Sequence, residues 1–195
     1  MTDITFILTA VKDRMPNVEY LQKHIPGLVI VWDEHRNAME TFRRAWRQYQ
    51  DVPTIRIQDD IILCKDFVAK AKTVVAERPN DFIQFFSRSA KDEELGSRYK
   101  SGGSWMMNQC YYLPAGSAAR LTAYADAWGK YDKHPNGDDQ LMAEWLQSEK
   151  ARYWVQVPSL VNHLVTVSMI DKRRSKFRQS TTFFDPEYDG SPAAK

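Results

Sequence analysis

Two kinds of hydrophobic pattern alternate along this chain. Short, nearly continuous apolar runs are typical of strands buried on both faces of a sheet; they occupy residues 4–9, 28–32, 54–57, 81–86, 105–113 and 153–157. Between them, apolar residues recur at three- and four-residue steps, which predicts helices over 18–25, 38–49, 67–77, 115–131 and 138–150. The alternation predicts an α/β fold with a mixed, mainly parallel sheet and helices on both faces.

Length and composition predict a single domain. A chain of 195 residues with 43% hydrophobic content can bury one sizeable core. We place this domain at residues 1–180 and expect 181–195, with Pro186, Gly190 and Pro192, to be a flexible tail. The two cysteines, Cys64 and Cys110, lack metal-ligand spacing and are predicted to be buried thiols.

Net charge and the absence of signal-like or membrane-spanning segments limit the classes of function that fit this sequence. The formal net charge is only +2, from 27 basic and 25 acidic residues, which is too balanced to indicate nucleic-acid binding by bulk charge. The first eight residues lack the basic start and cleavage site of a secretory signal, and no apolar run approaches the roughly 20 residues that cross a bilayer. We therefore expect a soluble, cytoplasmic protein with no membrane partner.

An acidic pair, Asp59–Asp60, follows the predicted strand at 54–57 directly. Adjacent carboxylates at a strand end repel each other unless a cation or hydrogen-bond donor compensates them. Mg²⁺ and Mn²⁺ prefer such oxygen ligands, commonly together with substrate phosphates. The pair therefore indicates either a metal site or a turn with solvated acids.

A second acidic pair, Asp138–Asp139, follows Gly137 and begins a predicted helix. One of the two carboxylates is expected to cap that helix. The other is then available to take a proton from an attacking hydroxyl, which is general-base catalysis. The pattern leaves open which residue has which role.

Two further features lie near the C-terminus. His163 ends the segment 157–163, and a neutral imidazole there is either a structural group or a ligand for Mn²⁺. Downstream, Lys172, Arg173 and Arg174 belong to a basic run that suits a diphosphate, a nucleic-acid backbone or merely a solvated surface.

In their order along the chain, the motifs Gln58-Asp59-Asp60, Gly137-Asp138-Asp139 and Val157 to His163 resemble those of compact GT-A glycosyltransferases of phages and bacteria. The resemblance spans roughly Asp3 to Arg178. It implies a Rossmann-like GT-A fold, a nucleotide-sugar donor with a UDP-sugar preferred, and Mn²⁺ or Mg²⁺ as cofactor. For a phage-encoded chain, the location would be the host cytoplasm.

The resemblance also implies roles for individual residues. Asp60 and His163 would bind the metal, and Asp139 would be the base, with Asp138 as the alternative. The remaining predicted donor-binding residues are Asp33, Arg36, Gln58, Asp59, Lys172, Arg173 and Arg174. Gln58 departs from the family pattern, which has an acid at this position, so the contact to the donor ribose is open.

The implied function is transfer of a sugar to an acceptor hydroxyl. One acceptor is a hydroxymethylated pyrimidine in phage DNA; saccharide and protein acceptors fit the motifs equally well. Acceptor recognition would fall to the polar segment 87–104, predicted to be a mobile loop, and to Trp105 unless that ring is part of the core. The alternative from another class is a GT-A-like binding module without turnover. A dinucleotide-cofactor enzyme is disfavoured because no Gly-x-Gly-x-x-Gly loop follows any predicted strand.

Overall fold

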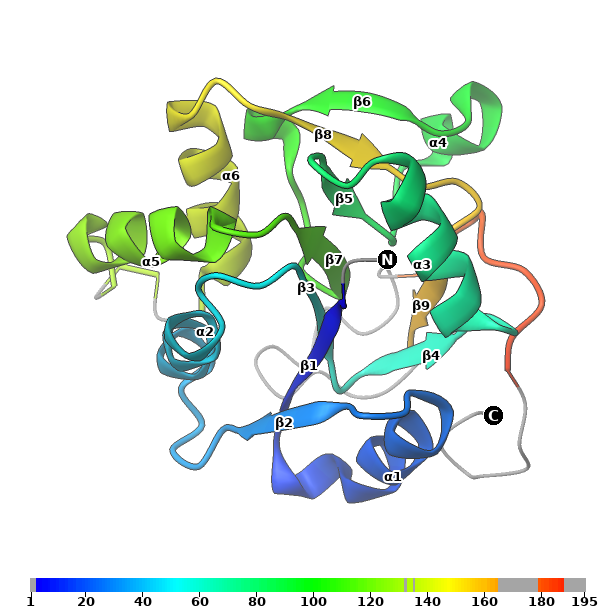
Figure 1. Cartoon of the computed structure of the whole chain (residues 1–195), viewed down its shortest axis with the longest axis horizontal. Helices are drawn as coiled ribbons and strands as arrows, with labels where there is room; N and C mark the ends of the chain where they lie inside the picture. Colours follow the sequence, from blue (N-terminus) through cyan, green and yellow to red (C-terminus); the bar gives the residue numbers. More distant parts are fainter. Residues whose placement is uncertain (1–2, 132, 135, 165–178, 188–195) are drawn as a thin grey trace.

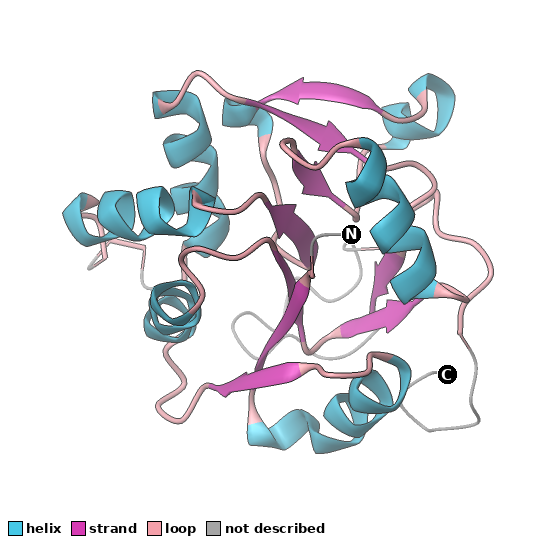
Figure 2. Cartoon of the chain, in the orientation of Figure 1, coloured by secondary structure: helices cyan, strands magenta, loops and turns pink. Residues whose placement is uncertain are grey.

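A seven-stranded sheet with helices on both sides organises the chain in a computed structural model that describes residues 3–131, 133–134, 136–164 and 179–187 (Figures 1 and 2). The strands of this sheet are β1 (Thr5–Ala10), β2 (Val29–Trp32), β3 (Thr54–Gln58), β5 (Phe82–Gln84), β6 (Arg98–Ser101), β7 (Cys110–Leu113) and β8 (Arg152–Val155). A separate two-stranded sheet pairs β4 (Ile61–Leu63) with β9 (Val161–His163).

The strand order in the large sheet is β2-β1-β3-β7-β5-β8-β6. Pairing is parallel for β1 with β2, β1 with β3 and β5 with β8, and antiparallel for the other three neighbouring pairs. The predicted α/β class and mixed sheet are confirmed. The described sheet is less parallel than predicted, because β7 enters its centre in the opposite direction to both of its neighbours.

The α-helices are α1 (Met15–His24), α2 (Ala38–Gln48), α3 (Phe67–Glu77), α4 (Ala90–Leu95), α5 (Ser117–Ala127) and α6 (Asp138–Ser148); two 3-10 turns are η1 (Lys12–Arg14) and η2 (Gly102–Ser104). Helices α1 and α3 pack with β4 on one face of the sheet, and α2, α5 and α6 pack on the other (Figure 1). Helices on both faces were predicted, and the two hydrophobic clusters confirm this. No described helix is long and apolar enough to cross a membrane.

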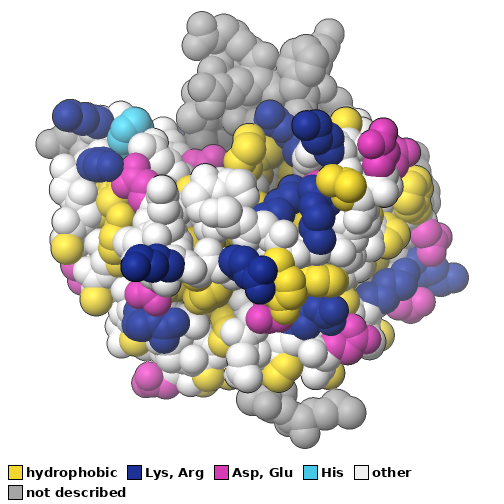
Figure 3. Space-filling model, turned by 90° about the horizontal axis from the view of Figure 1, so that it is seen from above, with side chains coloured by type: hydrophobic (Ala, Val, Ile, Leu, Met, Phe, Trp, Pro, Cys, Tyr) yellow, Lys and Arg dark blue, Asp and Glu magenta, His cyan; other side chains and the backbone are white. Residues whose placement is uncertain are grey.

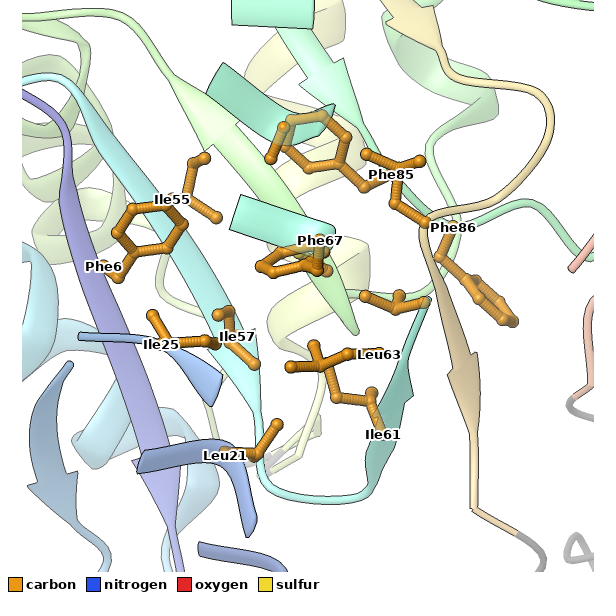
Figure 4. Close-up of a cluster of buried hydrophobic side chains, with 14 of the residues drawn as sticks. Phe6, Leu21, Ile25, Ile55, Ile57, Ile61, Leu63, Phe67, Phe85 and Phe86 are labelled. Carbon is orange, nitrogen blue, oxygen red and sulfur yellow. The ribbon is translucent and has the colours of Figure 1, made fainter. Parts of the chain in front are cut away.

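The larger core cluster is formed by side chains from one face of the strands and from the apolar faces of the helices (Figure 4). Phe6 on β1 and Ile55 and Ile57 on β3 contribute alternate side chains to the same face of the sheet, because successive side chains in a strand point to opposite faces. Leu21 of α1 and Phe67 of α3 close over them. Cys64 and Cys110 are buried free thiols, as predicted.

The strand predicted at 105–113 begins only at Cys110. Trp105 and residues 107–109 are buried but lie outside the strand ladder, and the Trp105 Nε1–H donates to Asn108 Oδ1 at 2.7 Å. The segment 87–104 is not an irregular loop, because α4, β6 and η2 lie within it. Gly102 explains part of this order, because a Cβ there would lie 2.6 Å from Leu146 Cβ and would hold η2 away from α6.

Asp92 is the polar centre of this segment. Its fully buried carboxylate accepts hydrogen bonds from Ser87 Oγ, from Arg98 Nη2 and, at 2.8 Å, from Lys100 Nζ. Burial alone would raise the pKa of Asp92, but hydrogen bonds from Lys100, Ser87 and Arg98 together hold it below its ordinary value. The acid thus joins α4 to β6.

Replacing Asp92 with Asn should therefore lower the free energy of unfolding by on the order of 2 kcal/mol near pH 7. Because the folded-state pKa is depressed, the ionised carboxylate stabilises the fold above about pH 4 and loses this effect as the pH falls through the folded-state value. Urea unfolding of both proteins from pH 7 downward should show the difference shrinking toward acid pH. A difference that stays constant with pH would contradict the ionic interpretation.

Residues 179–187 span the predicted boundary between domain and tail, and they pack on the small sheet. The Glu187 N–H donates to the Leu63 carbonyl at 2.8 Å, and the Lys65 N–H donates to the Asp185 carbonyl at 2.8 Å. The Ser180 N–H donates to Asn162 Oδ1 at 2.9 Å, one residue before His163. This part of the chain therefore belongs to the folded body and lies beside β9.

Candidate functional site

Polar residues gather at the edge of the sheet where β1, β2 and β3 end. These strands are parallel, so their carboxyl ends meet at one edge, which is where ligands bind in open α/β sheets. The Asp33 N–H after β2 donates to the carbonyl of Ala10 at 2.7 Å, and the Gln58 N–H donates to the carbonyl of Gln109 at 2.9 Å. Helix η1 follows β1 at the same edge, and the Asp59–Asp60 pair follows β3.

The acidic pair is buried and compensated by a guanidinium. Asp59 Oδ2 accepts the Val11 N–H at 2.7 Å, and its Oδ1 lies 2.5 Å from Arg14 Nη1. The same Nη1 lies 3.1 Å from Asp60 Oδ2. Burial raises the pKa of Asp59, and the charge of Arg14 offsets part of this effect. The structure therefore excludes a solvent-exposed turn at Asp59–Asp60.

Helix α1 also fixes the main chain of the pair. Asn17 lies one turn after Arg14, and its Nδ2 donates to the Asp59 carbonyl at 2.6 Å and to the Ile61 carbonyl at 3.1 Å. These two bonds hold the turn between β3 and β4 from the first turn of α1, directly after Arg14, which supplies the guanidinium. The carboxylate positions are thus set by backbone contacts as well as by charge.

His163 meets this pair from β9. Its Nε2 lies 3.1 Å from Asp60 Oδ2, and its Nδ1 lies 2.6 Å from the Leu164 carbonyl. The Leu164 N–H donates to the Asp60 carbonyl at 2.7 Å, so β4 and β9 are joined on both sides of the contact. The structure thus brings together Asp60 and His163, the two predicted metal ligands.

The donor chemistry of this pair fits a divalent cation. A carbonyl can only accept, so Nδ1 carries a proton, and Nε2 is the ring nitrogen that faces Asp60 and could bind a cation through its lone pair. The buried Nε2 makes no hydrogen bond of normal geometry to any described residue. Two ligands at right angles around an ion at about 2.1 Å lie about 3 Å apart, which matches the 3.1 Å between Nε2 and Oδ2. The described residues contain no group of three or more His, Cys, Asp or Glu side chains arranged to hold a metal.

The two residues of the second acidic pair, Asp138 and Asp139, differ in their contacts and in their burial. Asp138 Oδ2 accepts from Arg56 Nη1 at 3.2 Å and from Asn108 Nδ2 at 3.0 Å, and the side chain is buried. Asp139 is half-buried, and its Oδ1 accepts the Gln140 N–H at 2.8 Å. Asp138 therefore anchors the start of α6 to the sheet, whereas the Asp139 carboxylate is more accessible.

Arg56 is a buried charge within β3. It is 2% exposed; its Nη2 donates to Thr9 Oγ1 at 3.1 Å, and its guanidinium lies 5.1 Å from the centre of the Phe42 ring. Arg56 thereby joins β1, β3 and the beginning of α6. Inside the sheet its two Nη atoms have a carboxylate and a hydroxyl as partners and an aromatic face lies nearby, whereas the buried Nε makes no hydrogen bond to a described residue.

Of the other predicted donor-binding residues, those that the structure describes lie at or near the same edge. Asp33 Oδ1 accepts the Asn37 N–H at 2.8 Å and thus shapes the turn before α2. Arg36 is exposed and pairs with Asp13 at 2.8 Å. Gln58 is the last, half-buried residue of β3. Lys172, Arg173 and Arg174 lie outside the described residues. Trp105 is 3% exposed and packs edge-on against Tyr111 and Tyr153, so it belongs to the core.

Sequence reasoning missed Arg14, Asn17, Arg56 and Asn108. The position of Arg14 just beyond the first strand was an available signal, because that loop lies at the ligand-binding edge of an α/β sheet. Arg56, a charge between Ile55 and Ile57, was a second signal, since a charge in a buried strand needs a partner. No local pattern connects either arginine with its acid.

Comparisons with known proteins are limited to likeness of fold. No protein-family profile and no curated protein sequence matches this chain. The crystal structure of A197 from STIV is similar with a TM-score of 0.50 and 12% identity, over 96% of this chain and 98% of that one. A putative glucose-1-phosphate thymidylyltransferase from Bacillus anthracis, crystallised with sucrose, gives a TM-score of 0.47 and 7% identity over 89% of this chain and 94% of that one. This chain therefore shares an α/β fold with A197 over nearly the full length of both.

Proposed function

We propose that this chain is a metal-dependent glycosyltransferase that transfers a sugar from a nucleotide sugar, with a UDP-sugar as the preferred donor, to an acceptor hydroxyl. The observation that carries the proposal is the 3.1 Å contact between Asp60 Oδ2 and His163 Nε2 at the carboxyl edge of the sheet. These residues are far apart in the sequence and come from different motifs, which the GT-A resemblance assigns to one metal site.

The two protein ligands suit a cation whose coordination is completed by substrate. Mg²⁺ and Mn²⁺ sites at phosphates commonly use one or two protein ligands together with phosphate oxygens. In this proposal Asp60 and His163 hold Mn²⁺ or Mg²⁺, which would offset the negative charge that develops on the departing diphosphate. The Leu164 carbonyl keeps the His163 ring oriented through Nδ1.

In the proposed step, the acceptor oxygen forms a bond to the anomeric carbon while the bond from that carbon to the diphosphate oxygen breaks. The bonding electron pair leaves with the nucleoside diphosphate, and the acceptor proton passes to a carboxylate. We assign this base to Asp139, because its half-buried carboxylate is more accessible than that of Asp138. Asp138 then positions the helix through Arg56 and Asn108.

Acceptor identity is proposed as a class, a hydroxyl-bearing saccharide, protein or hydroxymethylated pyrimidine of phage DNA. On the face shown in Figure 3, Lys and Arg side chains are interspersed with Asp, Glu and hydrophobic side chains. This mixed surface does not single out the DNA acceptor, and the predicted basic run lies outside the described residues. All three classes therefore belong in the assay.

The test is calorimetry with UDP and UDP-sugars, with and without Mn²⁺, followed by measurement of nucleotide release with each acceptor class. We expect Mn²⁺-dependent donor binding and acceptor-stimulated release. The Asp139→Asn variant should bind the donor as the wild type does but transfer sugar about 10²- to 10⁴-fold more slowly, the usual contribution of a positioned base.

The Asp138→Asn variant is the matched control, because it removes the neighbouring carboxylate and should mainly reduce stability. Donor binding without transfer or hydrolysis under any condition would instead identify a nucleotide-sugar binding module. Equal transfer by wild type and Asp139→Asn would remove Asp139 from the mechanism.

A further inference from the structure

Arg14 contacts the acidic pair at the oxygen that is proposed to bind the divalent cation. Its Nη1 is 2.5 Å from Asp59 Oδ1 and 3.1 Å from Asp60 Oδ2, the same oxygen that lies 3.1 Å from His163 Nε2. The exposed fraction of the Arg14 side chain is only 17%. One guanidinium nitrogen is therefore shared by the two buried carboxylates and supplies one compensating positive charge.

The local backbone holds Arg14 in this position. It is the last residue of η1 and precedes α1, and its N–H donates to the Val11 carbonyl at 3.1 Å. The Val11 N–H in turn donates to Asp59, and Asn17 binds the main chain of the pair from the next turn. Guanidinium and carboxylates are thus fixed by one connected set of hydrogen bonds.

We propose that Arg14 is a built-in competitor for the divalent cation at Asp60 and His163, an inference that rests on the proposed function. A dication bound to Asp60 Oδ2 would lie next to the positive guanidinium, and like charges at such short range repel strongly. Metal alone therefore has to displace Arg14 from Asp60. A nucleotide diphosphate brings compensating negative charge and accepts bidentate hydrogen bonds from the displaced guanidinium.

The consequence is coupled binding. Mn²⁺ without nucleotide binds weakly, because Arg14 competes for the acids; Mn²⁺ with a nucleoside diphosphate binds strongly, because the guanidinium has a new partner. By linkage, Mn²⁺ strengthens nucleotide binding by the same factor. The arginine thereby disfavours a metal-loaded site without donor.

The test measures free Mn²⁺ by its EPR signal, with and without UDP, and needs no turnover. In the wild type, UDP should tighten Mn²⁺ binding by a factor between about 5 and 150, the usual range for coupled sites. Arg14→Met should bind Mn²⁺ alone several-fold more tightly than the wild type, and UDP should tighten its Mn²⁺ binding less. If Arg14→Met does not fold, Arg14→Gln takes its place, because it keeps hydrogen-bond donors without the charge. The same changes in Mn²⁺ affinity are expected of it.

Arg47→Gln is the control, because Arg47 is a half-exposed arginine on α2 whose partner is Asp126; its Mn²⁺ affinity should equal that of the wild type. If Mn²⁺ binds through Asp60 and His163 but Arg14→Met and Arg14→Gln leave its affinity unchanged or weaken it, Arg14 is not a competitor. The metal site itself would still stand. If neither the wild type nor the Arg14 variants bind Mn²⁺, with or without UDP, both the metal site and the inference fail.

Discussion

The double substitution of Asp60 with Asn and His163 with Gln should abolish Mn²⁺-dependent binding of a nucleotide sugar and slow sugar transfer by at least about 10³-fold. Both side chains are replaced by neutral groups of similar size, so the loss falls on cation binding. Metal stabilisation of a leaving group is worth several kcal/mol, and each 1.36 kcal/mol is a factor of ten in rate. Calorimetry with Mn²⁺ and UDP, and nucleotide release at saturating donor, measure the two effects.

The control for this experiment is Asp126→Asn, which removes an exposed acid of α5 that pairs with Arg43 and Arg47 of α2. It should leave Mn²⁺ and donor binding at wild-type values. Thermal unfolding of all variants without metal shows whether the double variant is folded. A folded double variant that retains Mn²⁺-dependent donor affinity would refute the metal site.

Replacing Arg56 with Met should lower the free energy of unfolding by about 3–5 kcal/mol, the usual effect of removing one partner from a buried ion pair. Arg56 and Asp138 are both buried at 3.2 Å, and without the guanidinium the Asp138 carboxylate retains Asn108 as its described side-chain donor. Arg56 holds Asp138 at the start of α6, next to Asp139. Without Arg56 the position of the Asp139 carboxylate is less well fixed, so sugar transfer should also fall. Urea unfolding and transfer at saturating donor measure these effects separately.

The matched variants distinguish a lost ion pair from lost packing. Adding Asp138→Asn to Arg56→Met should recover part of the stability, since the second change removes the unpaired charge. Arg47→Met breaks an exposed pair and should change stability by no more than about 0.5 kcal/mol. If Arg56→Met were as mild as Arg47→Met, Arg56 would not position α6.

Local pattern was sufficient for most elements. The predicted helix 67–77 coincides with α3, and the predicted strands 4–9, 28–32 and 54–57 lie within a residue of β1, β2 and β3 at most ends. The helix shows a helical apolar period and the strands are short, nearly continuous apolar runs, so the local pattern carries the information. The start of β7 was misplaced because Trp105 and residues 107–109 are as buried as a strand, yet polar groups of this segment bond within the loop and to neighbouring segments.

For the site, motif order predicted that Asp60 and His163 would lie together, and their geometry agrees. The repulsion within Asp59–Asp60 was predicted to require a cation or a hydrogen-bond donor, or else exposure to solvent in a turn. The structure shows that Arg14 contacts both acids, which no sequence pattern indicated. A general base at the start of α6 was predicted as a choice between Asp138 and Asp139. The structure gives the two residues different surroundings, because Arg56 contacts the buried Asp138 and Asp139 is half-buried.

Residue order alone thus establishes the α/β alternation, the acidic pairs and the late histidine, because strand and helix periods and short motifs are local properties of a chain. The partners of Asp59, Asp60 and Asp138 depend on which strands become neighbours. Arg14 reaches Asp59 only because β1 and β3 pair in parallel, and Arg56 reaches Asp138 only because α6 packs on the face of the sheet. Charges that neutralise each other inside the fold come from distant segments, so their pairing follows from the folded arrangement and from no pattern within a single segment.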